Sequence, residues 1–318
     1  MAENGEPIQD LAHLGYVELL TPKPDESLWY FTDLLGMEEV HRDGPSAYLR
    51  GYGDYAAFTL KLTEAKQSGV GTIAWRATSA QALERRAQAI EGAGLGIDWA
   101  DGDYSKGRTY RFRDPDGHAM EIYFEQEKYA APEHLRSTLR NLPMKFPTRG
   151  VGVRRNDHLA VLCQDVPANR EFAQNILGLH LREQVIFDNG ATEIGSWMSN
   201  NAIHHEIAYV VDVKGASGRL HHYAMWVDNR EEVLRAADIF MDNGIFIEAG
   251  PSKHNNSQGF YIYSYEPGGN RVEVYTGGLW VFDPDFETVV WDEETRNGGV
   301  HWGAALPESF LNYATPPV

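Results

Sequence analysis

The stretch that decides the fold is Leu11-Ala12-His13-Leu14-Gly15-Tyr16-Val17-Glu18-Leu19, because the chain repeats it as Asn156-Asp157-His158-Leu159-Ala160-Val161-Leu162-Cys163. Each run is short, mostly apolar and typical of a strand, with a histidine near its start. Each leads past a proline to a helical segment that ends at a glycine, Ser27–Leu35 before Gly36 and Ala168–Leu177 before Gly178. The two halves of the chain therefore begin in the same way.

The parallel continues to the end of each half. A second strand and helix are expected over residues 71–76 and 79–92, and again over 220–227 and 230–244. Each half then closes with a hairpin, whose turns are Pro115-Asp116-Gly117 and Pro267-Gly268-Gly269. This order predicts an α+β fold of two tandem domains. Each domain has two strand-helix-strand-strand-strand units, with mixed sheets curled around a central cavity.

The domain boundaries follow from the same landmarks. A linker is expected at Pro143–Val151, which contains Pro147 and Gly150. We expect a non-catalytic domain over residues 1–145 and a catalytic, metal-binding domain over 146–280. Residues 281–318 form an aromatic, proline-bearing tail without periodicity, which is expected to pack over the second domain.

Composition excludes several classes of protein. The 318 residues are 42% hydrophobic and 23% charged, which is typical of globular proteins, and the net charge of −18 disfavours nucleic acid and anionic membranes as partners. Cys163 is the only cysteine, so an internal disulfide or a cysteine-rich zinc site is impossible. No apolar run reaches the roughly 18 residues of a membrane span. Residues 1–6 are acidic and lack the features of a signal peptide, so we expect a cytoplasmic protein.

Three polar residues occupy repeat-equivalent strand positions in the second half: His158, His222 and Glu273. Singly, each has an ordinary reading as a hydrogen-bonded strand residue. Together, two imidazoles and one carboxylate leave open positions on an octahedral metal, which suits Fe(II) chemistry with O₂ better than zinc.

The first half provides an internal control for this candidate site. It keeps His13 and Glu121, but Thr72 or Ile73 stands in the place of His222, and Ala57 falls near the place of His205. We therefore expect the metal in the second half only.

Residues 156–276 resemble the catalytic domain of the type I extradiol catechol dioxygenases, in the vicinal oxygen chelate superfamily. The matching stretches are Asp157-His158-Leu159, Ile203-His204-His205-Glu206-Ile207-Ala208, Gly218-Arg219-Leu220-His221-His222, and Gly250-Pro251-Ser252-Lys253-His254 through Tyr261-Ile262-Tyr263 to Gly269-Asn270-Arg271-Val272-Glu273-Val274-Tyr275. The tail stretches Asp283-Pro284-Asp285 and Val290-Trp291-Asp292 are similar to those of the catechol and homoprotocatechuate 2,3-dioxygenases. The resemblance covers nearly the whole chain.

The resemblance implies a role for each of these residues. His158, His222 and Glu273 would bind Fe(II), or Mn(II) in some members, and His205 would be the acid/base residue. His254 and Tyr263 would flank and help to deprotonate the substrate, and Trp197 would line the pocket. His221 is expected on the face of its strand opposite His222, because side chains alternate. Family members are commonly homotetramers.

The implied reaction is cleavage of a catechol by O₂ to a 2-hydroxymuconic semialdehyde-type product. Members that act on homoprotocatechuate hold its carboxylate with arginines, and those places are Ala249 and the region of Gly298-Gly299 here. We therefore expect a neutral catechol, with alkyl and halo substituents among the candidates. Gln258 stands where the catechol branch often has a further histidine.

Two other readings stay open at this point. The same superfamily contains glyoxalase-like isomerases and epimerases, which stabilise an enediolate with four metal ligands and no O₂. It also contains drug-sequestering proteins without catalysis, which need no metal. Metal analysis with aerobic and anaerobic catechol assays distinguishes all three.

Overall fold

A computed structural model describes residues 9–318. The expectation that the N-terminus lacks a signal peptide rests on residues 1–6, which lie outside the described residues. Among residues 9–318, no helix combines the length and the apolar character that crossing a membrane requires.

The first half folds into one sheet with two helices. Its helices are α1 (Pro24–Trp29), continued by a π-helical turn over Tyr30–Leu34, and α2 (Ala80–Gly92). Its strands are β1 (Leu11–Thr21), β2 (Glu38–Asp43), β3 (Ser46–Arg50), β4 (Leu60–Glu64), β5 (Gly69–Ala77), β6 (Gly96–Ala100), β7 (Thr109–Arg113) and β8 (Ala119–Tyr123). They form an eight-stranded sheet in the order β2-β3-β4-β1-β5-β8-β7-β6.

The second half repeats this plan. Its helices are α3 (Val166–Phe172), continued by a π-helical turn over Ala173–Leu177, and α4 (Arg230–Asp242). Its strands are β9 (Arg155–Cys163), β10 (His180–Phe187), β11 (Thr192–Ser199), β12 (Ile207–Val211), β13 (Arg219–Trp226), β14 (Ile247–His254), β15 (Gly259–Tyr265) and β16 (Arg271–Gly277). The central strand order, β12-β9-β13-β16, matches β4-β1-β5-β8 of the first half.

Each half therefore has two strand-helix-strand-strand-strand units, as the sequence predicts. Within a unit the first and last strands pair in parallel, as β9 does with β12, and the two units meet through the antiparallel pair β9/β13. The helices begin and end where capping residues allow: Ser79 and Asn229 accept N–H bonds at the starts of α2 and α4, and Gly178 adopts φ +82° after the second π turn.

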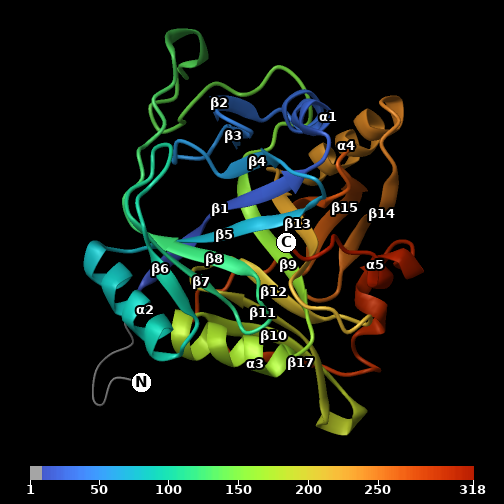
Figure 1. The fold of residues 1–318 in the computed structure, drawn as a ribbon. Helices are drawn as coiled ribbons and strands as arrows, with labels where there is room; N and C mark the ends of the chain where they lie inside the picture. The colour runs from blue at the N-terminus through green and yellow to red at the C-terminus, as the bar shows by residue number, and fades with distance from the viewer. Residues whose placement is uncertain (1–8) are drawn as a thin grey trace.

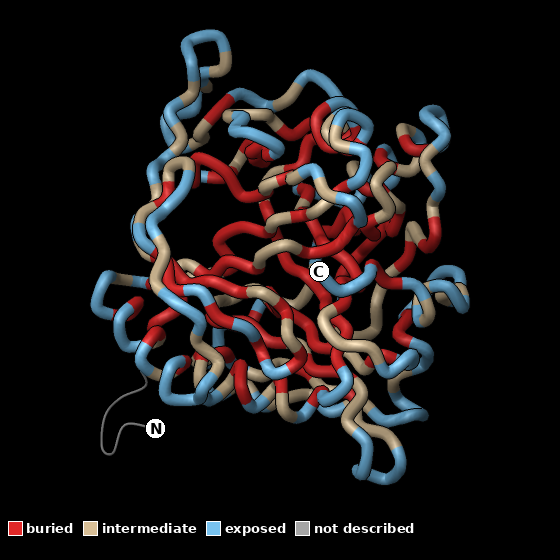
Figure 2. Tube along the Cα trace, viewed as in Figure 1, coloured by how far each residue is buried: buried red, intermediate tan, exposed pale blue. Residues whose placement is uncertain are grey.

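One apolar core runs through both halves. The π turn after α1 lies against α4, where the rings of Tyr30 and Phe240 stack with centroids 5.7 Å apart (Figure 1). The π turn after α3 lies against α2 in the same way. Buried residues follow the strands at the centre of the molecule, and the exposed segments are mostly outer loops (Figure 2). Because the halves share this core, neither sheet can move far without the other.

The tail extends the second sheet at both of its edges. Strand β17 (Val289–Trp291) pairs in parallel with β10, and β18 (Val300–Trp302) pairs antiparallel with β14. The short helix α5 (Glu308–Asn312) follows. Pro143–Val151 contains neither helix nor strand. The boundaries 1–145, 146–280 and 281–318 stay a prediction.

Candidate metal centre

The three predicted metal ligands come from adjacent central strands. Ala224 on β13 lies opposite His158 on β9 and also opposite Glu273 on β16, so these two side chains flank it at one level of the sheet. His222 precedes Ala224 by two residues on the same strand. All three side chains are buried, and their ligand atoms lie within 4.8 Å of one another.

The distances within the cluster are short. Glu273 Oε2 lies 3.0 Å from His158 Nε2 and 3.3 Å from His222 Nε2, and the two imidazole nitrogens are 3.4 Å apart. Burial alone would raise the pKa of Glu273, but the neighbouring imidazoles hold it well below its ordinary value. The carboxylate is therefore ionised in a buried place that needs positive charge.

The donor set fits a divalent metal ion. Neither oxygen of Glu273 accepts a well-formed hydrogen bond from any described residue, although the carboxylate is fully buried. Two imidazole nitrogens and a carboxylate oxygen without such a partner form the ligand set of non-haem Fe(II) and Mn(II) sites. A metal ion at this place would replace only the 3.4 Å contact between the two imidazole nitrogens.

Asp157 prepares His158 for this role. Its Oδ2 lies 2.8 Å from His158 Nδ1, and its Oδ1 lies 2.6 Å from Arg155 Nη1. Burial opposes ionisation of Asp157, but Arg155 and His158 lower its pKa below the ordinary value. An ionised Asp157 accepts the Nδ1 proton, so Nε2 of His158 is the ring atom that faces Glu273.

His221 contacts Nδ1 of His222, as Asp157 contacts Nδ1 of His158, although we expected His221 on the opposite face of the strand. We expected His221 on the opposite face, but a β-bulge interrupts the β9/β13 register: Leu220 pairs with Val161 and His222 with Ala160, which leaves His221 as an extra residue. Alternation fails at the bulge, and His221 Nδ1 lies 2.6 Å from His222 Nδ1.

The tail fixes the proton on His221. Its Nε2 lies 2.7 Å from the carbonyl oxygen of Phe310, which can only accept. Burial lowers the pKa of His221 well below its ordinary value, so the ring is neutral. Its Nδ1 then accepts the Nδ1 proton of His222, and the Nε2 lone pair of His222 faces the cluster.

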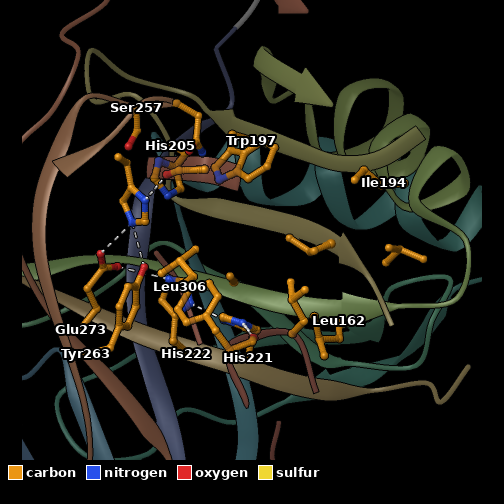
Figure 3. A pocket seen from close by; sticks show the side chains of 18 of the residues that line it. Leu162, Ile194, Trp197, His205, His221, His222, Ser257, Tyr263, Glu273 and Leu306 are labelled. Carbon is orange, nitrogen blue, oxygen red and sulfur yellow. Dashed lines mark hydrogen bonds and ion pairs between the residues drawn. The ribbon is translucent and has the colours of Figure 1, made fainter. Parts of the chain in front are cut away.

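The remaining predicted residues surround the same cavity of about 360 Å³. His205, Tyr263 and Glu273 gather at one end, and Leu162 and Ile194 lie toward the other (Figure 3). The ring centroid of His205 is 4.0 Å from that of His158, and burial lowers the pKa of His205 well below its ordinary value. Trp197 also lines the cavity.

His254 and Tyr263 form a hydrogen-bonded pair beside the cluster. His254 Nε2 is 3.1 Å from Tyr263 Oη and 3.6 Å from Glu273 Oε1, and His254 Nδ1 is 3.0 Å from the carbonyl oxygen of Gly299. Burial raises the pKa of Tyr263 well above its ordinary value, so the phenol stays protonated. Gln258, in contrast, is exposed and does not line the cavity.

Sequence reasoning missed the part of the tail that closes the cavity. Arg296, Leu306 and Phe310 all line it. Arg296 makes no ion pair with any residue of 9–318, and burial lowers the pKa of its guanidinium. Apart from the resemblance at Gly298-Gly299, the signal in the sequence was the aromatic composition of the tail, because segments this short carry no periodicity.

The first half has a counterpart to the cluster, and it differs from our expectation. Ala74 on β5 lies opposite Tyr16 and Glu121, as Ala224 lies opposite His158 and Glu273. Tyr16, not His13, therefore holds the place of His158. Bulges between Leu11 and His13 and between Leu14 and Tyr16 shift the register.

The rest of this counterpart is filled by side chains. Thr72 takes the place of His222, as expected, and Phe58 rather than Ala57 takes the place of His205, because Leu60 pairs with Val17 as Ile207 pairs with Leu159. Lys106 Nζ lies 2.5 Å from Glu121 Oε1 and 3.2 Å from Tyr16 Oη. A lysine ammonium thus stands beside the buried carboxylate.

Comparison with known proteins agrees with this arrangement. A family model described as the Glyoxalase/Bleomycin resistance protein/Dioxygenase superfamily matches residues 13–122 and 155–274. The chain is 44% identical to a metapyrocatechase of Geobacillus stearothermophilus over 314 residues, which are 98% of this chain and 95% of the relative. It is 37% identical to a manganese-dependent 2,3-dihydroxybiphenyl 1,2-dioxygenase of Geobacillus genomosp. 3, over 92% of this chain and 94% of the relative.

A solved structure gives the same result for the fold. The homoprotocatechuate 2,3-dioxygenase of Arthrobacter globiformis superposes with a TM-score of 0.86 at 25% identity, covering 97% of this chain and 93% of that one. The two matched segments of the family model coincide with the two halves of the fold. The chain therefore belongs to the glyoxalase/dioxygenase superfamily and, within it, to the type I extradiol catechol dioxygenases.

Proposed function

We propose that the enzyme cleaves the ring of a neutral catechol with O₂, next to the two hydroxyl groups, to give a 2-hydroxymuconic semialdehyde-type product. The metal is Fe(II), with Mn(II) as the alternative, and its ligands are His158, His222 and Glu273. The observation that carries this proposal is the convergence of those three side chains with His205, His254 and Tyr263 on one cavity.

The ligands are prepared by their own neighbours. When bound, the metal ion supplies Lewis acidity toward the catechol oxygens and one-electron chemistry toward O₂. Asp157 and His221 keep protons on the Nδ1 atoms of His158 and His222, so Nε2 of each ring is the atom that would hold the metal.

His254 and Tyr263 handle the first proton. His254 Nδ1 donates to the carbonyl oxygen of Gly299, so Nε2 accepts from Tyr263 Oη in the free enzyme. When Tyr263 turns its proton to a catechol oxygen, Nε2 becomes the acceptor for a catechol hydroxyl proton. Tyr263 stays protonated and donates, so the pair can orient the ring through both of its oxygens. The 3.1 Å contact between His254 Nε2 and Tyr263 Oη holds the two side chains next to each other.

His205 acts later, as a base and then as an acid. Its buried ring is neutral, so it can take up a proton while negative charge develops on oxygen and return it when the ring opens. It contacts His158 but is not part of the ligand cluster. Removing it should therefore slow turnover without releasing the metal.

The cavity lining supports an apolar substituent on the ring. Phe187, Ile194, Val210 and Leu306 line the cavity, and Ile194 lies at the end away from Glu273 (Figure 3). Arg296 favours a second candidate, a catechol that carries an anionic group, because its guanidinium has no ion-pair partner among residues 9–318. The neutral substrate is our first choice because apolar side chains form most of the wall.

Two measurements test these assignments. The enzyme is reconstituted anaerobically with Fe(II) or Mn(II) and assayed for O₂ uptake and yellow product with catechol. A panel of 3-methylcatechol, 2,3-dihydroxybiphenyl and homoprotocatechuate is then ranked by kcat/KM, with Arg296→Leu as the matched variant. A preference for homoprotocatechuate that Arg296→Leu abolishes would replace the neutral substrate by the anionic one. Methylglyoxal-thiol isomerisation without O₂ uptake would replace the whole proposal.

Several wider expectations belong to the same proposal. Residues 146–280 would form the catalytic domain, 1–145 the non-catalytic one and 281–318 the closing tail. This assignment is supported by Lys106, whose ammonium contacts Glu121 where a metal ion would otherwise lie in the first half. A cytoplasmic location and a homotetramer stay predictions, and sedimentation of the purified enzyme tests the second.

A further inference from the structure

Two buried residues beside His205 have no part in the mechanism described so far. They are His204, its neighbour in sequence, and Glu183 on β10. We propose that Glu183, acting through His204, fixes the proton on Nδ1 of His205 and so presents the unprotonated Nε2 to the substrate. This inference rests on the proposed role of His205 as the acid/base residue.

The three side chains contact one another in series, from His205 through His204 to Glu183. His205 Nδ1 lies 2.9 Å from His204 Nδ1, and His204 Nε2 lies 3.3 Å from Glu183 Oε1. His205, His204 and Glu183 are all buried. His204 Nε2 makes no hydrogen bond with any other described residue, so the carboxylate is the group that can determine its protonation.

Glu183 is itself held in one orientation. Its Oε2 accepts two N–H groups, from the indole of Trp291 at 3.0 Å and from the backbone of Ser257 at 3.2 Å. Trp291 lies on β17 of the tail, and Ser257 precedes β15. Because these donors occupy Oε2, Oε1 is left to face His204.

Proton positions follow from these partners. The carboxylate oxygen of Glu183 favours a proton on His204 Nε2, because an unprotonated Nε2 would turn its lone pair toward the negative oxygen. A neutral His204 then has its lone pair on Nδ1. His205 can satisfy that lone pair only by donating from its own Nδ1, which leaves its Nε2 free as a base at the cavity wall. The arrangement works as the aspartate does in serine hydrolases, which orients a histidine and fixes its tautomer.

The substitution Glu183→Gln should reverse this pattern. The amide oxygen must take the place of Oε2, because Trp291 and Ser257 both donate there. The amide NH₂ group then faces His204 Nε2, which has to accept, and the Nδ1 proton of His204 turns toward His205. His205 would then carry its proton on Nε2 and could not act as a base.

The test combines kinetics and a spectrum. With the Fe(II)-loaded enzyme and catechol at saturating O₂, we expect Glu183→Gln to lower kcat by about 100-fold, the lower limit of what a general base contributes. The KM for catechol and the metal content per chain should be unchanged. Long-range ¹H–¹⁵N spectra of the Zn(II)-loaded enzyme with ring-labelled histidine should show His205 change from the Nδ1–H to the Nε2–H tautomer.

Three further variants complete the experiment. Glu193→Gln on β11 is the matched control, because this partly buried carboxylate pairs with Arg170 and does not line the cavity; it should leave kcat and the His205 signals unchanged. Glu183→Asp keeps the charge and should recover most of the lost kcat. His204→Phe removes the acceptor for the Nδ1 proton of His205 and should lower kcat to the same extent. It tests the proposal independently if the Glu183→Gln protein does not fold.

The outcomes separate this inference from the function on which it rests. If His205→Ala loses turnover while Glu183→Gln and His204→Phe keep kcat within about twofold and leave the His205 tautomer as it was, the inference is wrong and the proposed function stands. If His205→Ala keeps full turnover, His205 is not the acid/base residue. The contacts from Glu183 through His204 to His205 then have no role in catalysis. Addition of Glu183→Gln to His205→Ala should cause no further loss of kcat.

Discussion

The two halves of this enzyme solve the same electrostatic problem in different ways. Each buries a glutamate on the last strand of its sheet core, Glu121 in one and Glu273 in the other. In the first half Lys106 contacts the carboxylate, with Tyr16 beside it. In the second half two histidines face the carboxylate through ring nitrogens. A buried carboxylate requires a cation, and the first half supplies it from its own chain, whereas the second is built to take one from solution.

The largest difference between the halves should appear when each glutamate is neutralised. Glu273→Gln removes the only anionic ligand, so the metal content of the purified enzyme should fall to background. Turnover should fall by more than the roughly 100-fold that loss of an outer partner of a metal ligand costs. Glu121→Gln should keep metal content and kcat. Metal analysis of both variants checks this, and loss of metal from Glu121→Gln would place a second site in the first half.

The acid/base positions give the next contrast. His205→Ala should lower kcat by about 10²–10⁴-fold, the range for a lost general base, with metal content unchanged. Phe58, at the equivalent place in the first half, packs against Tyr16 with ring centroids 4.9 Å apart. Phe58→Leu should lower the free energy of unfolding by up to about 1.5 kcal/mol and leave kcat as it is. An iron-free His205→Ala protein would show that His205 is a ligand instead.

Lys106→Met tests the first half, because it removes the cation that contacts Glu121. It leaves Glu121 buried without its cation, so the free energy of unfolding should fall by about 3–5 kcal/mol. The double variant Lys106→Met/Glu121→Gln removes both charges and should recover most of that loss. Urea titration measures both values, and turnover of the folded fraction should be normal in each. Full stability of Lys106→Met alone would contradict the view that this ammonium replaces a metal ion.

Asp157→Asn is expected to have the smallest effect. The amide can no longer hold the proton on His158 Nδ1 as the carboxylate does, so metal affinity should weaken by about 10–100-fold. A competition titration with a chelator measures the change. The residue before Tyr16 in the first half is Gly15, which offers no such partner, in keeping with a half that needs no ligand. An unchanged affinity would remove Asp157 from the account of the site.

Sequence patterns predicted the parts of this molecule that repeat. The paired runs, hairpin turns and helix-ending glycines led to the two sheets, and the equivalent strand positions brought together His158, His222 and Glu273. The errors lie where strand pairing is irregular. Bulges moved Tyr16 into the place expected for His13 and brought His221 beside His222, and a bulge leaves no mark on the pattern of apolar residues.

The tail shows the other limit of sequence reasoning. Strands β17 and β18 have three residues each, which is too short for an alternating pattern to register. Their places are set by pairing at the two edges of the sheet, where Val289 lies opposite Glu183 and Trp302 lies opposite Lys253. The residues that close the cavity, Leu306 and Phe310 among them, could be found only from the structure.

The tail makes the orientation of the site depend on a segment that lies beyond the ligand residues in the chain. Trp291 and Phe310 both follow Glu273 in the chain, and they hold Glu183 and His221. A chain that stopped at Glu273 would keep the three ligand residues but lack the indole N–H that Glu183 accepts and the carbonyl oxygen that His221 contacts. Truncation after the second domain should therefore keep the three ligand residues and remove the groups that orient the histidines around them.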